Sequence, residues 1–347
     1  MKERIEWIDW LKGIALVLVI IGHTFRTSMY SENMIYGYIK SFIYAFHMPL
    51  FISISGFLFQ SNRNNYMNIN ILDFFRNKWK SYMKPLISYA AIMYIIFSIF
   101  SIISGFKIML GRGIGLTEYF LLTITGENPY SVHLWYLLTT FLIVITCYVV
   151  LKISSKTHHD EMFVLFILAF VLWNIRILWG EDFCMTVKSY LKYSIFFVLG
   201  MILNKKRIDV PQKYYLLLSF ISWVYIFIYS TDMIKTTMFL YRYLKNALVL
   251  ISCFVIIINF FDVARSDFFH SKFIKYLGKN SMVFYLFHQP FCAMLGIVLF
   301  EKIGLPGYSV CLLCFLGSII LPELVIRASK KNLFVKAALS GLFNIKV

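Results

Sequence analysis

The stretch that decides the fold is the first long apolar run, IEWIDWLKGIALVLVIIGHT, at residues 5–24. It is long enough to cross a bilayer as a helix, since a span needs about 20 mostly apolar residues. Its ionisable side chains include Asp9, Lys12 and His23. Because ionisable groups inside a span cost several kcal/mol, each is a candidate functional residue.

These three side chains share one face of the predicted helix. Lys12 and His23 are eleven residues apart, which at about 100° per residue leaves roughly 20° of rotation. At about 1.5 Å per residue they lie about 16 Å apart along the axis. Asp9 precedes Lys12 by three residues and lies on the same side. The alternative is structural: a lysine that reaches to the interface and a histidine bonded to a neighbouring helix.

The composition of the whole chain agrees with a membrane protein. Of its 347 residues, 60% are hydrophobic and only 15% are charged, and the net charge is +17. A soluble domain of this size would not bury so much apolar surface, and the composition also excludes disorder, collagen and a disulfide scaffold. We therefore expect an all-α, polytopic helical bundle that forms a single domain over residues 1–347.

Ten apolar runs are candidate spans, and Pro49 and Pro322 fall inside two of them. The runs lie at 7–27, 38–60, 83–105, 131–151, 161–180, 190–204, 214–232, 242–261, 278–300 and 306–327. If the N-terminus is cytoplasmic, 22 of the 34 lysines and arginines fall on the cytoplasmic side and 11 on the other. The positive-inside rule therefore places both termini in the cytoplasm. The net charge is then assigned to cytoplasmic loops and lipid headgroups, with no nucleic acid as partner.

The first run is expected to stay in the mature protein, because it lacks a small-residue cleavage site. Among the six cysteines, Cys311 and Cys314 form a CxxC pair inside an apolar run, without a second ligand pair. Small apolar packing is favoured over metal or redox chemistry for them, and no metal is expected.

Further polar residues occur at the ends of other spans. Those on the outer side are His47, before Pro49, and His133 and Trp135, at the start of the fourth span. In the ninth span, His288 shares a buried polar helix face with Ser281 and Tyr285. In the tenth span, Glu323 lies near Arg327 and is expected to pair with it.

A basic stripe follows the second span, in DFFRNKWKSYMKP. Arg76 and Lys80 are four residues apart and Lys84 comes one turn later. Such a stripe would hold the phosphates of a nucleotide-type cofactor or the headgroups of lipids, and its charge does not separate the two.

Together these segments resemble the acyltransferase 3 family of integral membrane O-acyltransferases, in particular its fucose-4-O-acetylase-like members. The family's basic residue, ten intervening residues and histidine correspond to Lys12 and His23. Its later motifs are similar to HMPLFISISGFLF at 47–59, KPL at 84–86, HLWYL at 133–137 and LGKNSMVFYLFH at 277–288. Many members carry arginine where this chain has Lys12, so a phosphate contact there would be monodentate.

The resemblance implies transfer of an acyl group, usually acetyl, from cytoplasmic acetyl-CoA or another acyl-CoA to a hydroxyl of a cell-surface or lipid-linked glycan. It implies catalytic roles for His23, as general base or as a covalent acyl carrier, and for Asp9. It also implies that acetyl-CoA is bound by Lys12, Arg76 and Lys80. A further set of residues is expected to orient the acceptor or to stabilise the oxyanion, namely His47, His133, Trp135, His288 and Glu323. The expected setting is a bacterial plasma membrane, with lipid and proteins of a polysaccharide pathway as partners.

A transporter of a polysaccharide or lipid-linked sugar is the alternative, because it too would line its path with buried polar groups. Two features favour the enzyme. Lys12 and His23 are arranged one-sidedly above a basic cytoplasmic stripe, and the spans show no duplicated half of the kind found in many transporters. A bare scaffold is disfavoured, since it would not need so many ionisable groups inside the membrane.

Overall fold

The computed structural model describes residues 5–102, 115–128, 131–157, 160–179, 182–206, 211–231, 239–266 and 270–331, and within these it contains helices and no strand. The N-terminal half comprises α1 (Glu6–Thr24), α2 (Ile35–Ser61), α3 (Arg63–Met67), α4 (Ile71–Lys78), a π-helical turn (Trp79–Met83), α5 (Lys84–Ile102), α7 (Leu116–Thr125) and α8 (Trp135–Thr157). The C-terminal half comprises α9 (Glu161–Trp179), α10 (Met185–Lys205), α11 (Gln212–Ser230), α12 (Phe239–Arg265), α13 (Lys272–Lys279), α14 (Ser281–Gly296), a second π-helical turn (Ile297–Lys302) and α15 (Gly307–Lys331). The predicted all-α membrane architecture is confirmed.

Eight of the helices in the described residues are long and apolar enough to cross a membrane. They are α1, α2, α8, α9, α10, α11, α12 and α15, and each coincides with a predicted span. The two other predicted spans fall on α5 and on α14. A total of ten spans and the cytoplasmic position of both termini therefore stay predictions.

Two span boundaries differ from the prediction. The sixth span, predicted at 190–204, begins at Met185, because α10 continues through Lys188 and the polar residues that line a cavity. The ninth, predicted at 278–300, is interrupted at Asn280, so its first two residues belong to the separate helix α13. Gly278 of α13 lies directly on the backbone carbonyl of Asp9, and a Cβ atom there would overlap it.

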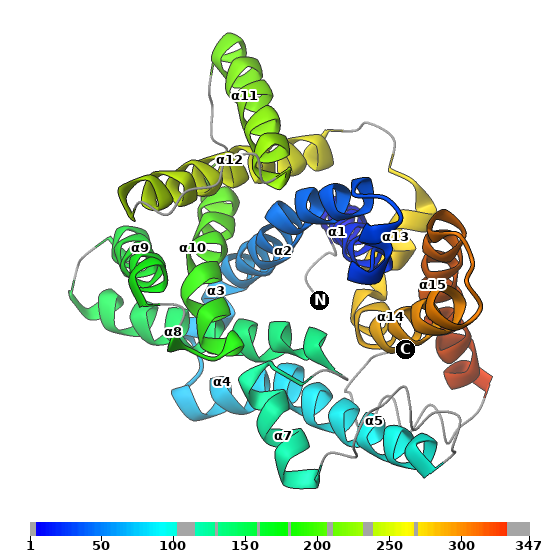
Figure 1. Cartoon of the computed structure of the whole chain (residues 1–347). Helices are drawn as coiled ribbons and strands as arrows, with labels where there is room; N and C mark the ends of the chain where they lie inside the picture. The colour runs from blue at the N-terminus through cyan, green and yellow to red at the C-terminus, as the bar shows by residue number, and fades with distance from the viewer. Residues whose placement is uncertain are drawn as a thin grey trace.

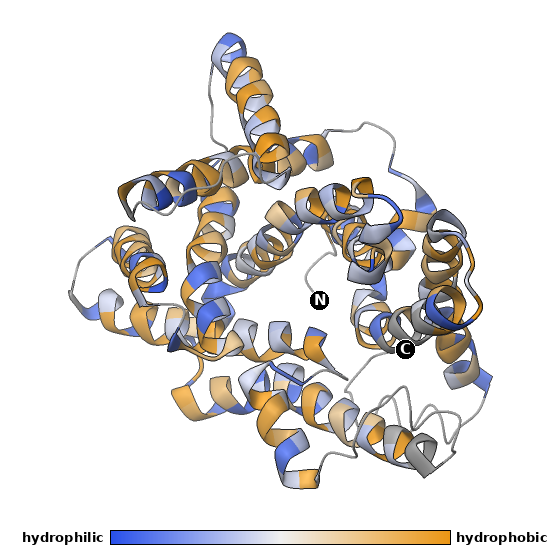
Figure 2. Cartoon of the chain, viewed as in Figure 1, coloured by the Kyte–Doolittle hydropathy of each residue, from blue (hydrophilic) through white to orange (hydrophobic). Residues whose placement is uncertain are grey.

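The helices follow one another around a ring, in which α2, α10 and α8 pass to α5, α14 and α15 and then to α13 and α1 (Figure 1). α9, α11 and α12 lie outside this ring. Hydrophobic residues dominate the peripheral helices as well (Figure 2), and Phe220 of α11 is 69% exposed. Such exposed apolar faces are suited to contact with lipid.

α2 and α10 are packed backbone to backbone. Gly56 faces the carbonyl of Phe197 and Gly200 faces the carbonyl of Ser53, and a Cβ atom on either glycine would overlap that carbonyl. The Ser53 hydroxyl donates a hydrogen bond of 2.8 Å to the carbonyl of Phe196. Small residues permit this kind of close approach between membrane helices. The contact lies in the second half of each helix, and it fixes α10 beside α2, the helix that carries His47.

Candidate functional site

Helix α1 connects two groups of polar residues at opposite ends of the bundle. Asp9 and Lys12 lie in its first two turns and His23 lies in its last turn. We call the end that holds Asp9 and Lys12 the Asp9 end. We call the end that holds His23, His47, His133 and His288 the histidine end. The predicted separation of about 16 Å between Lys12 and His23 applies because α1 is one uninterrupted helix.

At the histidine end, His23 is held by a tyrosine of α2. The hydroxyl oxygen of Tyr44 lies 3.2 Å from Nδ1 of His23. The Tyr44 ring also contacts His47, with 4.8 Å between ring centroids. His23 is partly exposed, whereas His47 is buried and donates from Nδ1 to the carbonyl of Ile43 at 2.8 Å. Sequence reasoning did not identify Tyr44, although its position three residues before His47 on one helix face pointed to it.

Two further histidines, from other helices, lie beside His23. The ring centroid of His288 is 5.3 Å from that of His23 and 5.7 Å from that of His133. Tyr285 packs against His133 at 5.5 Å, and its hydroxyl donates to the His133 carbonyl. His288 and Tyr285 do share one face of α14, as their spacing predicted.

Backbone carbonyls fix the tautomers of these two buried rings, because a carbonyl oxygen accepts and does not donate. His288 donates from Nδ1 to the carbonyl of Tyr285 at 2.8 Å, and His133 donates from Nε2 to the carbonyl of Leu286 at 3.2 Å. In the neutral rings the lone pair is therefore on Nε2 of His288 and on Nδ1 of His133. Neither nitrogen has a hydrogen-bond partner among the described residues. Both are buried acceptors without a partner among the described residues.

Trp135 packs behind the histidine end. Its ring is stacked on that of Tyr193 from α10, with 5.3 Å between centroids and 17° between the ring planes. Tyr193 in turn lies beneath the ammonium of Lys192, at 5.0 Å. Trp135 is nearly buried, so it supports the lining of the histidine end from behind.

At the Asp9 end, Asp9 and Lys12 form an ion pair, with 3.6 Å between Nζ of Lys12 and Oδ1 of Asp9. Asp9 is buried and Lys12 is partly exposed. Asp9 lies fourteen residues before His23 on the same helix, which is about 21 Å of axial rise. It therefore does not contact His23, and any part it takes in catalysis passes through Lys12.

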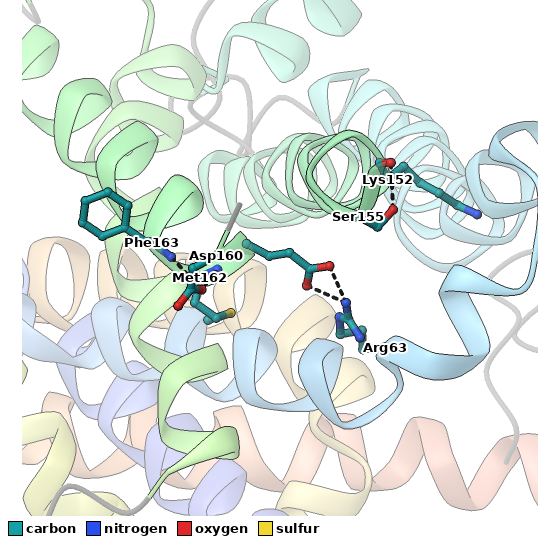
Figure 3. A network of polar contacts seen from close by, with 7 residues as sticks. Arg63, Lys152, Ser155, Asp160, Met162 and Phe163 are labelled. Atoms are coloured by element: carbon teal, nitrogen blue, oxygen red, sulfur yellow. Dashed lines mark hydrogen bonds and ion pairs between the residues drawn. The ribbon is translucent and has the colours of Figure 1, made fainter. Parts of the chain in front are cut away.

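A second ion pair at this end joins α3 to α9 (Figure 3). Nη2 of Arg63 lies 2.6 Å and 2.5 Å from the two carboxylate oxygens of Glu161. The neighbouring Asp160 accepts hydrogen bonds from the backbone N–H groups of Met162 and Phe163. Because these bonds stabilise its charged form, the pKa of Asp160 lies below its ordinary value. The start of α9 is fixed by these contacts.

The predicted basic stripe is only partly turned toward the fold. Arg76 is exposed and pairs with Asp73 at 3.6 Å, and Lys80 is exposed as well. Lys78, between them, points inward and donates to the hydroxyl of Tyr66 at 2.9 Å. Burial lowers the pKa of Lys78 to about 8. Lys78 follows the buried Phe74 by four residues, so the two side chains lie on the same, inward face of α4.

Glu323 also lies at the Asp9 end. Its carboxylate accepts from Nε of Arg327 at 2.8 Å, the predicted pairing, and from the hydroxyl of Tyr276 at 2.6 Å. Burial and this carboxylate raise the pKa of Tyr276 to about 12. The structure thus groups Glu323 with the Asp9 end and not with the four histidines.

The cysteines nearest the site are free thiols that pack as small apolar groups, as expected. Cys292 and Cys314 belong to a buried cluster with Met29 and Val310, behind the last turn of α1. The thiol of Cys292 donates to the carbonyl of His23 at 3.3 Å. In the part of the chain that the structure describes, no group of three or more His, Cys, Asp or Glu residues is placed to hold a metal ion.

Comparison with known proteins is consistent with this arrangement. A segment of 53 residues is 45% identical to nodulation protein NolL of Sinorhizobium fredii, and one of 53 residues is 49% identical to NolL of Mesorhizobium japonicum. Each match covers 14% of this chain and 14% of the relative. No solved structure matches the chain significantly. The model of the acyltransferase 3 family, described as an acyltransferase domain, matches residues 5–322, and the chain therefore belongs to that family.

Proposed function

We propose that this membrane acyltransferase moves an acyl group, in the simplest case acetyl, from acyl-CoA to a hydroxyl of a glycan or lipid-linked sugar, with His23 as general base. The observation that carries the proposal is the position of His23. Its ring is partly exposed in the last turn of α1, is bonded through Nδ1 to Tyr44, and faces a second imidazole that offers a free lone pair. An imidazole titrates near pH 6.5 and accepts a proton at neutral pH.

The contact with Tyr44 is compatible with the tautomer that this mechanism needs. When Nδ1–H of His23 donates to the Tyr44 hydroxyl oxygen, the lone pair is on Nε2. Nε2 then takes the proton of the acceptor hydroxyl as its oxygen attacks the thioester carbonyl. A C–O bond forms, the C–S bond breaks, and the proton passes from His23 to the departing CoA thiolate. In a covalent variant, Nε2 itself attacks first and an acyl-His23 intermediate is cleaved by the acceptor.

The tautomers of His133 and His288 favour acceptor binding over stabilisation of an oxyanion. An oxyanion needs hydrogen-bond donors. The unpartnered nitrogens of the two neutral rings, Nδ1 of His133 and Nε2 of His288, are acceptors. Sugar hydroxyls are donors that suit these nitrogens. We therefore assign His133 and His288 to orienting the sugar. His47, which contacts Tyr44, and Trp135, behind Tyr193, support the same binding region.

The Asp9 end is assigned to acyl-CoA. Lys12 is partly exposed and is oriented by Asp9, while Arg76 and Lys80 carry exposed charges suited to phosphates. With the cofactor phosphates at this end, the pantetheine arm would extend along α1 toward His23, over about 16 Å. The charge bias of the loops favours a cytoplasmic position for the Asp9 end, where an enzyme of a bacterial plasma membrane would meet acyl-CoA. Glu323 lies at this end, so we infer a role near the donor and not at the acceptor.

The test is acyl transfer from labelled acetyl-CoA to a membrane glycan fraction by the full chain in detergent or nanodiscs. His23→Gln should lower the rate by about 10²- to 10⁴-fold, the usual contribution of a general base. Its affinity for acetyl-CoA should be unchanged, since Lys12 and His23 are about 16 Å apart. Full activity of His23→Gln would refute the mechanism. Movement of unmodified glycan across the membrane, without transfer of label, would establish the transporter instead.

A further inference from the structure

Two adjoining cavities lie beside the histidine end, between α9, α10, α12 and α2. The first has a volume of about 360 Å³ and the second about 260 Å³. They share three lining residues, Arg176, Lys192 and Asn246. Neither cavity is lined by any of the histidines, and among the lining residues the proposed chemistry gives a direct role only to Tyr44.

The first cavity is strongly basic. Arg176 comes from the last turn of α9, Lys188 and Lys192 from the first turns of α10, and Arg242 from the first turn of α12. None of the described residues that line either cavity is acidic. The guanidinium of Arg176 donates to the side-chain carbonyl of Asn246 at 3.3 Å, which orients it. Four cations gathered around one space repel one another, so the arrangement is suited to a ligand of opposite charge.

The second cavity leads from these cations to the candidate base. Tyr44 is one of its lining residues, and the hydroxyl of Tyr44 lies 3.2 Å from Nδ1 of His23. Trp173 and Tyr229 supply aromatic walls. A ligand anchored at Arg176 and Lys192 would therefore extend past these rings toward His23. Pockets that combine apolar walls with a few charged groups fix the orientation of a bound molecule in this way.

We propose that the acceptor is a phosphate-bearing sugar, and that its phosphate or diphosphate is held in the first cavity by Arg176, Lys188, Lys192 and Arg242. A carboxylate would supply one negative charge against four cations, whereas a diphosphate supplies several. The arginine fork also matches phosphate oxygens in pairs. The sugar then extends from the second cavity past Tyr44 toward His23, where His133 and His288 would orient it. This inference rests on the proposed function, because it names the substrate class of the same site.

The direct test is binding of labelled inorganic pyrophosphate to the full chain in neutral phosphatidylcholine nanodiscs. Binding should be saturable and weaken as salt rises. Arg176→Gln and Lys192→Gln should each raise the Kd about tenfold, which is about 1.4 kcal/mol. Lys302→Gln is the matched control, because Lys302 is an exposed cation that lines neither cavity. Equal Kd values for the wild type and both cavity variants would overturn the proposal.

Competitors identify the source of the phosphate. Farnesyl diphosphate should displace pyrophosphate if the acceptor is lipid-linked, and glycerol phosphate polymer should do so if the phosphate belongs to a glycan chain. Either result supports the proposal. Equally strong displacement by adenosine 3′,5′-bisphosphate, the phosphate-bearing part of CoA, would assign the cavity to the donor and overturn it. Loss of pyrophosphate binding when phosphatidylglycerol replaces part of the neutral lipid would assign it to a headgroup, with the same consequence.

Failure of this inference is distinguishable from failure of the proposed function. If the wild type transfers acetyl groups and Arg176→Gln and Lys192→Gln do so at the same rate and acceptor KM, the cavity has no part in acceptor binding and the acyltransfer stands. If pyrophosphate binds and both variants weaken it while the wild type transfers no acyl group from any acyl-CoA, the cavity binds phosphate and the acyltransfer proposal falls.

Discussion

Replacing Tyr44 with Phe should lower kcat without changing the KM for acetyl-CoA. The substitution keeps the ring that packs on His47 and removes only the hydroxyl that lies 3.2 Å from Nδ1 of His23. A single hydrogen bond of this kind contributes a net ~0.5–1.5 kcal/mol. If all of it is used to hold His23 in the reactive orientation, kcat falls about 2- to 13-fold. The donor KM should not move, because Lys12 is about 16 Å from His23.

The assay is initial-rate acetyl transfer by the full chain in nanodiscs, with the acetyl-CoA concentration varied at saturating acceptor. Tyr38→Phe is the matched control. Tyr38 is an exposed tyrosine of the same helix, and its hydroxyl has no hydrogen-bond partner among the described residues. It should behave as the wild type. Wild-type kcat in Tyr44→Phe, or the same loss in both variants, would refute the reasoning that Tyr44 positions His23.

Three further predictions concern stability. Gly200→Ala should lower the free energy of unfolding by about 1–3 kcal/mol, because its methyl group meets the α2 backbone, and thermal unfolding in detergent should show this while Gly115→Ala, in open space, should not. Lys78 has a folded pKa of about 8 against an ordinary value of 10.5, so the unfolded chain binds more protons between these values and stability should rise with pH there. Relative to Lys78→Met, the melting temperature of the wild type should therefore increase from pH 8 to pH 10, and a flat difference would contradict the burial of this ammonium. Arg63→Ala should destabilise by about 1.5–3 kcal/mol by leaving the Glu161 carboxylate unpaired, and Arg63→Ala combined with Glu161→Ala should cost less than the sum of the two single changes, as a double-mutant cycle would measure.

The sequence predicted the helices well because their signal is local. An apolar run of sufficient length defines a span wherever it occurs, and all eight long apolar helices of the structure coincide with predicted spans. The errors fell where tertiary contacts override that signal. α10 begins five residues before the predicted span and includes Lys188, which lines a cavity. The ninth span breaks at Asn280, next to the point where Gly278 of α13 packs on the Asp9 carbonyl.

The site was predictable in part, along one helix at a time. Periodicity placed Lys12 and His23 on one face of α1, and Tyr285 and His288 on one face of α14. It does not relate one helix to another. Glu323 was therefore grouped with the histidines, although α15 carries it to Tyr276 at the opposite end. The roles of the site residues stay predictions.

The basic cavity shows most clearly what a single sequence hides. Arg176, Lys192 and Arg242 lie on three different helices and are separated by 16 and 50 residues along the chain. Taken singly, each of them is a lysine or arginine near the end of a span. The positive-inside rule counts such a residue only as an exception to the cytoplasmic excess of lysine and arginine. Only the packing of α9, α10 and α12 makes them one group.

The two ends of α1 together explain why an enzyme of this kind would be built around a membrane helix. In the proposed reaction the donor and the acceptor both carry phosphates, so both would need cations, and cations held in one small space repel one another. Placing Lys12 at one end of α1 and Arg176 with Lys192 beside the other separates the two phosphate sites by the length of the helix. The reacting atoms must still meet, and His23 lies where Tyr44 joins the acceptor cavity to α1. The long flexible arm of acyl-CoA is then what covers the distance, and the protein itself needs no movement across the bilayer.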